Sequence, residues 1–167
     1  MLPLPIGGAG FRRRTPGALI VLTPTLRTFP SIVHPLPSVF SMQRLKILLV
    51  EDDDDLRALY SYMLAATGYK VLAVRNGLEA LAEIQVNRPD VIVTDIMMPG
   101  LSGLDLIMAV RSNDELADLP VVAITSFGDS LREEARAAGA TDSIDKPTEI
   151  ARMREVIEAT VSRLSSE

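Results

Sequence analysis

The chain has 167 residues, 47% of them hydrophobic, and a formal net charge of −5, so it is long enough to bury the core of one ordinary domain. It contains no cysteine, which excludes disulfides, thiolate metal sites and cysteine nucleophiles and fits a reducing compartment such as the cytoplasm. With His34 as its one histidine, the chain also lacks the several imidazoles that a zinc site needs, so carboxylates must carry any chemistry.

Residues 1–41 differ in composition from the rest of the chain. They hold four of the 17 basic residues, none of the 22 acidic residues and seven of the 11 prolines, which leaves residues 42–167 with a net charge of −9. Because closely spaced prolines interrupt helices and central strands, we expect this Pro-rich extension to be disordered. It can be a targeting peptide, a regulatory tail or the product of a misplaced start. We favour the last interpretation, in which the extension is not native and Met42 is the first residue.

From residue 45 onwards, short apolar runs alternate with amphipathic segments. Residues 45–50 form a nearly continuous apolar run that ends in acids, which is typical of a buried parallel strand. In the next segment apolar residues recur at helical spacing, and Gly68 ends the pattern. The spacing predicts a single buried helix face made of Leu56, Leu59, Tyr60, Met63 and Leu64.

The alternation repeats through the middle of the chain. Residues 69–74 read as a second strand and residues 91–95 as a third. Between them Asn76 is placed to cap a helix that carries Glu79 at its third position. Ser102 is placed to cap the helix after the third strand.

The last third of the sequence continues the pattern. Residues 120–125 predict a fourth strand, and Ser130 with Glu133 predicts a capping box for a helix that Gly139 closes. Residues 141–145 predict a short fifth strand. A final helix is expected from about Thr148, with Ile150, Met153, Ile157, Thr160, Val161 and Leu164 along one stripe.

Strands and helices that alternate through short loops define the fold class. Such connections are right-handed crossovers, which place parallel strands side by side with helices on both faces. The sequence therefore predicts an α/β fold with a doubly wound, five-stranded parallel sheet.

Reactive side chains gather where these strands end, and ligand sites of doubly wound sheets lie at the carboxyl ends of the strands. They are Glu51, Asp52 and Asp53 after the first strand, Asp95 at the end of the third, Thr125 and Ser126 after the fourth and Lys146 after the fifth. Each alone has an ordinary interpretation, as a helix-start acid, a strand residue or a surface lysine, and for Asp54 and Asp55 we keep it. Their coincidence at one edge of the sheet indicates a charge-balanced site.

The chemistry of this set favours a phosphoryl group. Crowded carboxylates repel one another unless a cation relieves them, and a set of oxygen ligands without histidine or cysteine suits Mg²⁺. A carboxylate is ionised at neutral pH, so it can attack phosphorus without a general base. Lys146 can pair with phosphoryl oxygens, and the Thr125 hydroxyl can donate a hydrogen bond to them. Glycine-rich phosphate loops are missing, which argues against nucleotide binding.

The chain from residue 45 to about residue 164 resembles the receiver domain of two-component response regulators. The resemblance rests on Ile47-Leu48-Leu49-Val50-Glu51-Asp52-Asp53, Thr94-Asp95-Ile96-Met97-Met98-Pro99-Gly100-Leu101-Ser102-Gly103, Ala123-Ile124-Thr125-Ser126 and Asp145-Lys146-Pro147. These motifs occur in the family's order and at its separations. The resemblance implies a flavodoxin-like strand order of 2-1-3-4-5 and a receiver domain over residues 42–167.

The same resemblance implies roles for individual residues. Asp95 matches the phosphoaccepting aspartate, and Thr125 and Lys146 match the family's hydroxyl and lysine. Mg²⁺ is implied to bind Asp52, Asp95 and the backbone carbonyl of Met97, with Glu51 acting through water. The Lys146-Pro147 peptide bond is implied to be cis.

Two positions bear on how the signal is read and how long it lasts. Ser143 stands where most receivers carry an aromatic residue or histidine, so either the usual threonine–aromatic switch is altered or Ser143 simply leaves a shallow groove.

Met97 and Phe127 stand where family members flank the hydrolytic water, and neither side chain can orient a water. We therefore expect slow self-dephosphorylation, which, with Mg-dependent self-phosphorylation, is the only enzyme-like activity expected.

The leading functional hypothesis is a stand-alone response regulator that takes a phosphoryl group from a histidine kinase or phosphotransfer protein and signals to an output protein that the sequence does not identify. We expect no nucleic-acid partner, because the −9 charge of residues 42–167 opposes phosphate backbones and too few residues follow the last helix for a DNA-binding domain. No membrane partner is expected either, because no apolar run is long enough to span a bilayer.

The alternative function is a receiver-like binding module that works without phosphorylation. A haloacid-dehalogenase-type phosphatase is excluded, because that class needs an aspartate where this chain has Met97.

Overall fold

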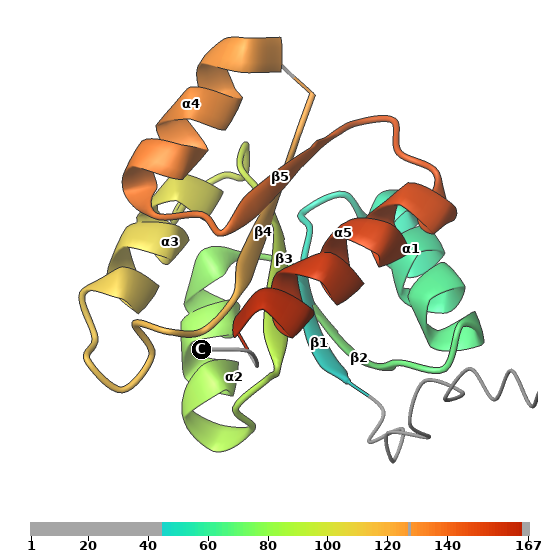
Figure 1. Ribbon diagram of the computed structural model, residues 1–167, viewed down its shortest axis with the longest axis horizontal. Helices are drawn as coiled ribbons and strands as arrows, with labels where there is room; N and C mark the ends of the chain where they lie inside the picture. The colour runs from blue at the N-terminus through green and yellow to red at the C-terminus, as the bar shows by residue number, and fades with distance from the viewer. Residues whose placement is uncertain (1–44, 127, 165–167) are drawn as a thin grey trace, which may run out of the picture. The chain divides into compact units, whose positions relative to one another are not determined.

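The computed structural model describes residues 45–126 and 128–164, and five strands alternate with five helices along this part of the chain (Figure 1). The expectations for residues 1–41 and for Phe127 lie outside these ranges. The elements are β1 (Lys46–Val50), α1 (Asp54–Ala66), β2 (Lys70–Val74), α2 (Gly77–Val86), β3 (Val91–Asp95), α3 (Gly103–Arg111), β4 (Val121–Thr125), α4 (Gly128–Ala138), β5 (Asp142–Asp145) and α5 (Ile150–Leu164).

All five strands join one parallel sheet in the order β2-β1-β3-β4-β5, so the predicted fold class and strand order are confirmed. The chain reverses its direction of winding between β1 and β3, which are neighbours in the sheet. In sheets of this kind the ends of the strands beside the reversal border the ligand site. The carboxyl ends of β1 and β3 therefore define where a functional site is to be sought.

Alternate residues of the central strands face two separate cores. Leu48 and Ile92 pack with α2, α3 and α4 on one face of the sheet, whereas Leu49 and Val93 pack with α1 and α5 on the other. Because both faces are covered, the central strands are apolar without a break, as the sequence pattern indicated. Figure 1 shows α5 and α1 on one side of the sheet, with α2, α3 and α4 on the other side, at the left of the strands.

The predicted helix starts and stops are mostly confirmed. The Asn76 side chain accepts a hydrogen bond from the Glu79 backbone N–H at the start of α2. Ser102 caps α3 in a capping box with Asp105. Gly68 and Gly139 both adopt φ of +104°, the left-handed conformation that glycine tolerates at helix ends.

Ser130 is not the cap of α4, which corrects the sequence prediction. The helix begins two residues earlier, at Gly128, so Ser130 lies inside the first turn. Its hydroxyl contacts the Glu134 carboxylate one turn ahead, at 3.3 Å. A serine three residues before a glutamate also occurs inside helices, so the pattern alone did not locate the helix start.

Leu59 is also a correction. The predicted buried face of α1 holds for Tyr60 and Leu64, which are buried, and Leu56 packs against the same core. Leu59 sits at the margin of that stripe and is 49% exposed. The contacts of α1 with β1, β2 and α5 therefore leave Leu59 about half exposed.

Candidate phosphoryl and cation site

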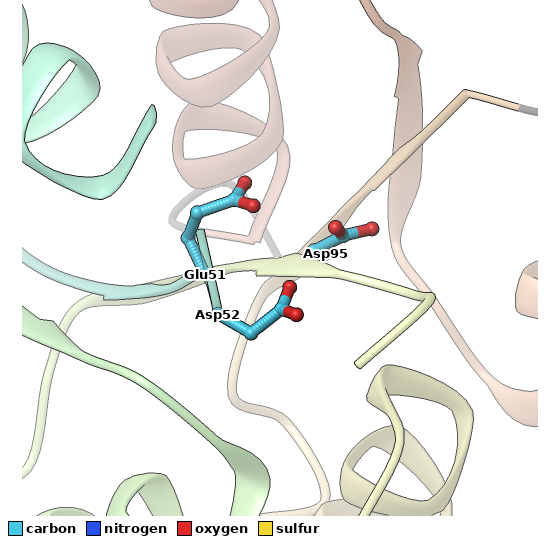
Figure 2. A group of neighbouring side chains, drawn as sticks. All are labelled: Glu51, Asp52 and Asp95. Atoms are coloured by element: carbon cyan, nitrogen blue, oxygen red, sulfur yellow. The ribbon is translucent and has the colours of Figure 1, made fainter. Parts of the chain in front are cut away.

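Three carboxylates meet at the carboxyl edge of the sheet. Glu51 and Asp52 follow β1, and Asp95 ends β3 in the neighbouring strand. Each offers one oxygen, and these three oxygens all lie within 4.8 Å of one another (Figure 2). The structure therefore brings together the three carboxylates that the sequence analysis placed in one site.

The three carboxylates differ in exposure. The side chain of Glu51 is 1% exposed and that of Asp95 is 10% exposed, whereas Asp52 is open to solvent. The site thus combines two buried carboxylates with one exposed acid. An ion or a phosphoryl group could enter from the side of Asp52.

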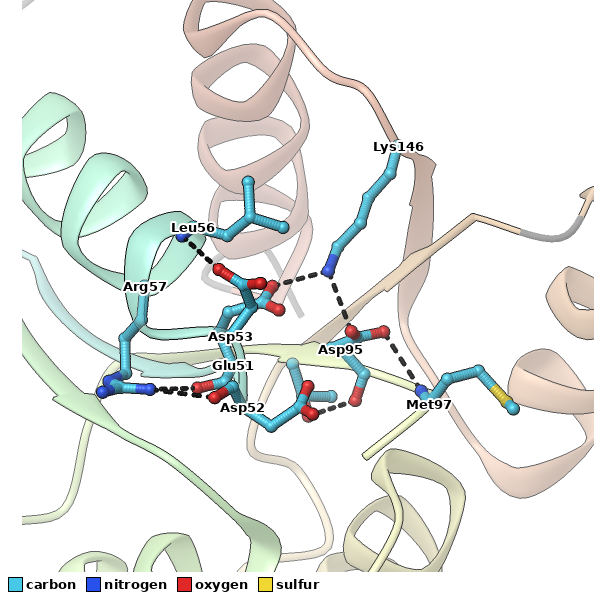
Figure 3. A network of polar contacts seen from close by, with 9 residues as sticks. Glu51, Asp52, Asp53, Leu56, Arg57, Asp95, Met97 and Lys146 are labelled. Atoms are coloured by element: carbon cyan, nitrogen blue, oxygen red, sulfur yellow. Dashed lines mark hydrogen bonds and ion pairs between the residues drawn. The ribbon is translucent and has the colours of Figure 1, made fainter. Parts of the chain in front are cut away.

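Lys146 joins the two buried carboxylates. Its Nζ donates hydrogen bonds to Oε2 of Glu51 at 2.6 Å and to Oδ2 of Asp95 at 2.8 Å (Figure 3). Its backbone N–H donates to the Thr125 carbonyl at 2.7 Å, and the Lys146-Pro147 peptide bond is cis, as expected. The ammonium group supplies a positive charge between two buried carboxylates.

Burial and charge shift the pKa values of Glu51 and Lys146. Burial raises the pKa of Glu51, and the opposing hydrogen bond and charge of Lys146 do not fully offset it. Burial works against the charged form of Lys146, but its hydrogen bonds to Asp95 and Glu51 outweigh burial and raise the pKa of the ammonium group. Lys146 is therefore held in its charged form.

Backbone groups complete the surroundings of Asp95. The Met97 N–H donates to Oδ1 of Asp95 at 3.1 Å, while the Met97 side chain is 56% exposed. Gly103 packs against the same strand end so closely that a Cβ there would lie 2.0 Å from the Asp95 carbonyl oxygen. Glycine at position 103 is therefore required for α3 to begin beside Asp95, a role that the sequence analysis did not assign.

The remaining predicted site residues lie nearby. Thr125 is buried at the end of β4, in the strand next to Asp95. Asp53 serves as the N-cap of α1, where its carboxylate accepts from the Leu56 N–H at 2.8 Å. Asp54 and Asp55 lie in the exposed first turn of α1, in agreement with their interpretation as helix-start acids.

Ser143 lies on β5 and lines shallow hollows on the surface formed by α4, β5 and α5. One hollow of about 280 Å³ also contacts Arg132, Pro147 and Arg152. A small side chain at this position therefore does leave a groove, as one of the two interpretations of Ser143 expected.

The donor set fits a hard divalent cation. Its carboxylate oxygens are close enough to share one ion, and oxygen ligands are those that Mg²⁺ prefers.

Among the residues that the structure describes, no helix has the length and apolar character needed to cross a membrane.

Comparison with known proteins gives a consistent result. A family model described as the response regulator receiver domain matches residues 47–158. The polar-differentiation response regulator DivK of Brucella anthropi is 37% identical over 114 residues, which cover 68% of this chain and 93% of that protein.

Solved structures show the same similarity. The chemotaxis response regulator CheY4 of Vibrio cholerae aligns with a TM-score of 0.66 at 30% identity, over 70% of this chain and 98% of that one. The receiver domain of a Pseudomonas aeruginosa sensor histidine kinase, solved with a magnesium ion coordinated in its active-site cleft, aligns with a TM-score of 0.67 at 28% identity, over 71% of this chain and 98% of that one.

Proposed function

This chain belongs to the response regulator receiver domain family, and on that premise we propose that it accepts a phosphoryl group on Asp95 from a histidine kinase or a phosphotransfer protein. The observation that carries the proposal is the position of the Asp95 carboxylate, within 4.8 Å of the Glu51 and Asp52 oxygens and hydrogen-bonded to the Lys146 ammonium. The cytoplasm is the compartment that we propose, which agrees with a sequence without cysteine.

In the proposed step an Asp95 carboxylate oxygen attacks the phosphorus atom of the donor. The new P–O bond forms as the donor's P–N bond to histidine breaks, and the imidazole leaves with the electron pair. Lys146 supplies a positive charge to the phosphoryl oxygens, and the Thr125 hydroxyl donates a hydrogen bond to them. The product is an acyl phosphate on Asp95.

Asp52, Asp95 and the Met97 carbonyl would hold Mg²⁺, with Glu51 acting through water, and the ion would neutralise charge on the phosphoryl oxygens. The exposed position of Asp52 beside the buried pair Glu51 and Asp95 supports this assignment. Output then passes through protein contacts, because phosphorylation changes the charge at the edge of the sheet from which α1, α3 and α4 begin.

Intact-mass measurement tests the proposal. The wild type and Asp95→Asn are incubated with acetyl phosphate and MgCl₂, and we expect one phosphoryl group to add to the wild type alone. The same gain in both proteins would show that the phosphorylated residue is not Asp95. No gain in either protein would favour the alternative function, a binding module that works without phosphorylation.

A further inference from the structure

Arg57 reaches back from the first turns of α1 to the backbone that carries the acidic pair. Its Nη1 donates to the carbonyl oxygen of Glu51 at 2.9 Å and to that of Asp52 at 3.3 Å (Figure 3). Its Nη2 pairs with the Asp54 carboxylate. One guanidinium group therefore spans the whole connection between β1 and α1.

The three carboxylates are held in different ways. Those of Glu51 and Asp95 are fixed by Lys146, and Asp95 also accepts from the Met97 N–H. For Asp52, no hydrogen bond to its carboxylate is found among the described residues. The direction in which this exposed side chain points therefore depends on its backbone, and its backbone carbonyl is bound by Arg57.

Arg57 extends from a helix start that is itself held by hydrogen bonds. Arg57 belongs to α1, and its own N–H donates to the carbonyl of the cap residue Asp53 at 2.9 Å. Asp53 also accepts from the Leu56 N–H, so the helix start is closed on both sides of the turn. The Arg57 side chain is only 19% exposed, which limits its freedom to leave.

The positive charge of Arg57 and its contacts with the two carbonyls should have opposite effects on Mg²⁺ affinity. A guanidinium group near the site repels a divalent cation, so on charge alone its removal should tighten Mg²⁺ binding. Loss of the two carbonyl contacts should instead loosen the turn and weaken binding. The sign of the change in affinity therefore separates the two roles.

We propose that Arg57 is a positioning residue, which ties the Glu51–Asp52 backbone to α1 and so holds the Asp52 carboxylate toward Glu51 and Asp95 before the ion binds. The inference rests on the proposed function, because that function places Mg²⁺ among these three carboxylates. Donation from Nη1 to two carbonyls and from Nη2 to the Asp54 carboxylate at the same time is a property of the planar guanidinium group that a lysine ammonium reproduces only in part.

The test compares three variants by calorimetric titration with MgCl₂ alone. Arg57→Met keeps the apolar stem and removes both charge and hydrogen bonds, and Arg57→Lys keeps the charge. Arg75→Met is the matched control, because Arg75 is an exposed arginine near the first turn of α1 that pairs with Glu79 and not with the turn. We expect Arg57→Met to weaken Mg²⁺ binding by about ten-fold, Arg57→Lys to weaken it less, and Arg75→Met to leave it unchanged or tighter.

A second measurement follows the turn without metal. Amide hydrogen exchange at residues 51–53 should be faster in Arg57→Met than in the wild type, and unchanged in Arg75→Met. Equal or tighter Mg²⁺ binding by folded Arg57→Met would overturn the inference, because Arg57 would then affect the ion only through its positive charge. If Arg57→Met does not fold, the same criterion is applied to Arg57→Lys. A wild type that binds no Mg²⁺ would instead overturn the metal site of the proposed function, and the exchange rates alone would then decide whether Arg57 orders the turn.

Discussion

The ammonium group of Lys146 lies 2.6 Å from Oε2 of Glu51, although 95 residues separate the two in the sequence. The contact joins the segment after β5 to the segment after β1, at opposite sides of the central strands β3 and β4. Because all three side chains are nearly buried, the charge of the Lys146 ammonium is the one that compensates the carboxylates of Glu51 and Asp95. This ion pair therefore ties the two ends of the site across the carboxyl edge of the sheet.

Replacing Lys146 with methionine should destabilise the protein. Two buried carboxylates would lose their cation, and breaking a buried pair in this way costs about 3 kcal/mol. We expect the free energy of unfolding at neutral pH, measured by urea denaturation without metal, to fall by roughly that amount. In the control Arg152→Met, which breaks an exposed pair with Glu155, the loss should be below about 1 kcal/mol. Equal losses in the two variants would contradict the compensation described above.

The Lys146 pair also predicts a dependence on alkaline pH. The pKa of Lys146 is raised in the folded protein, so its contribution to stability is fully present below the ordinary value of 10.5 and is lost as pH rises through the folded value. The wild type should therefore lose stability relative to Lys146→Met as pH rises from 10.5 through the folded pKa of Lys146. A constant difference between the two proteins across this range would argue against the raised pKa.

Asp52→Ala should lose most Mg²⁺ affinity while the fold survives. The change removes one ligand, but it also relieves repulsion among crowded carboxylates, so the metal-free variant should melt at the wild-type temperature or slightly above it. Calorimetric titration and thermal melting measure the two effects. Asp55→Ala, which removes an exposed acid from α1, is the control and should keep wild-type affinity. Wild-type affinity in Asp52→Ala would show that Asp52 is not a ligand.

Tyr69→Phe should raise the pKa of Glu158. The Tyr69 hydroxyl donates to Glu158 at 2.7 Å, and this hydrogen bond, followed by that from Arg154, lowers the pKa of the Glu158 carboxyl. A lowered pKa contributes stability above the ordinary value of 4.5, and this contribution is lost as pH falls through the folded value. The wild type should thus exceed Tyr69→Phe by less than about 1 kcal/mol at neutral pH, and the gap should close in acid. An NMR titration of Glu158 that gives the same pKa in both proteins would refute the assignment.

Much of the fold and site could be predicted because the pattern repeats on a short length scale. Apolar runs that end in Asp95 or in Glu51 and Asp52 indicate both a strand and the place where it stops. Parallel pairing then brings those ends to one edge of the sheet. The meeting of the three carboxylates follows from this topology.

Contacts between side chain and backbone could not be predicted in this way. Arg57 carries no motif of its own, because an arginine one turn into a helix is common, and only the path of the 51–53 turn brings two carbonyls within its reach. The requirement for Gly103 likewise depends on how closely α3 approaches Asp95. The error at Ser130 has the opposite origin, since its local pattern was present but the helix began earlier.

Met97→Asn should shorten the lifetime of the phosphorylated protein several-fold. The Met97 side chain is exposed beside Asp95 and cannot orient a water, whereas an amide can hold one for in-line attack. Loss of phosphoryl mass is followed over time after acetyl phosphate is removed. Met108→Asn, at an exposed methionine on α3, is the control. If Met97→Asn decays at the wild-type rate, the side chain at position 97 does not set the lifetime.

Direct location of the phosphoryl group tests the central claim. The protein is phosphorylated with acetyl phosphate and MgCl₂ and then treated with sodium borohydride, which reduces an acyl phosphate to the corresponding alcohol and converts an aspartyl phosphate to homoserine. Peptide sequencing by mass spectrometry locates the converted residue. The account predicts homoserine at position 95, and conversion of Glu51, Asp52 or any other carboxylate in place of Asp95 would contradict it.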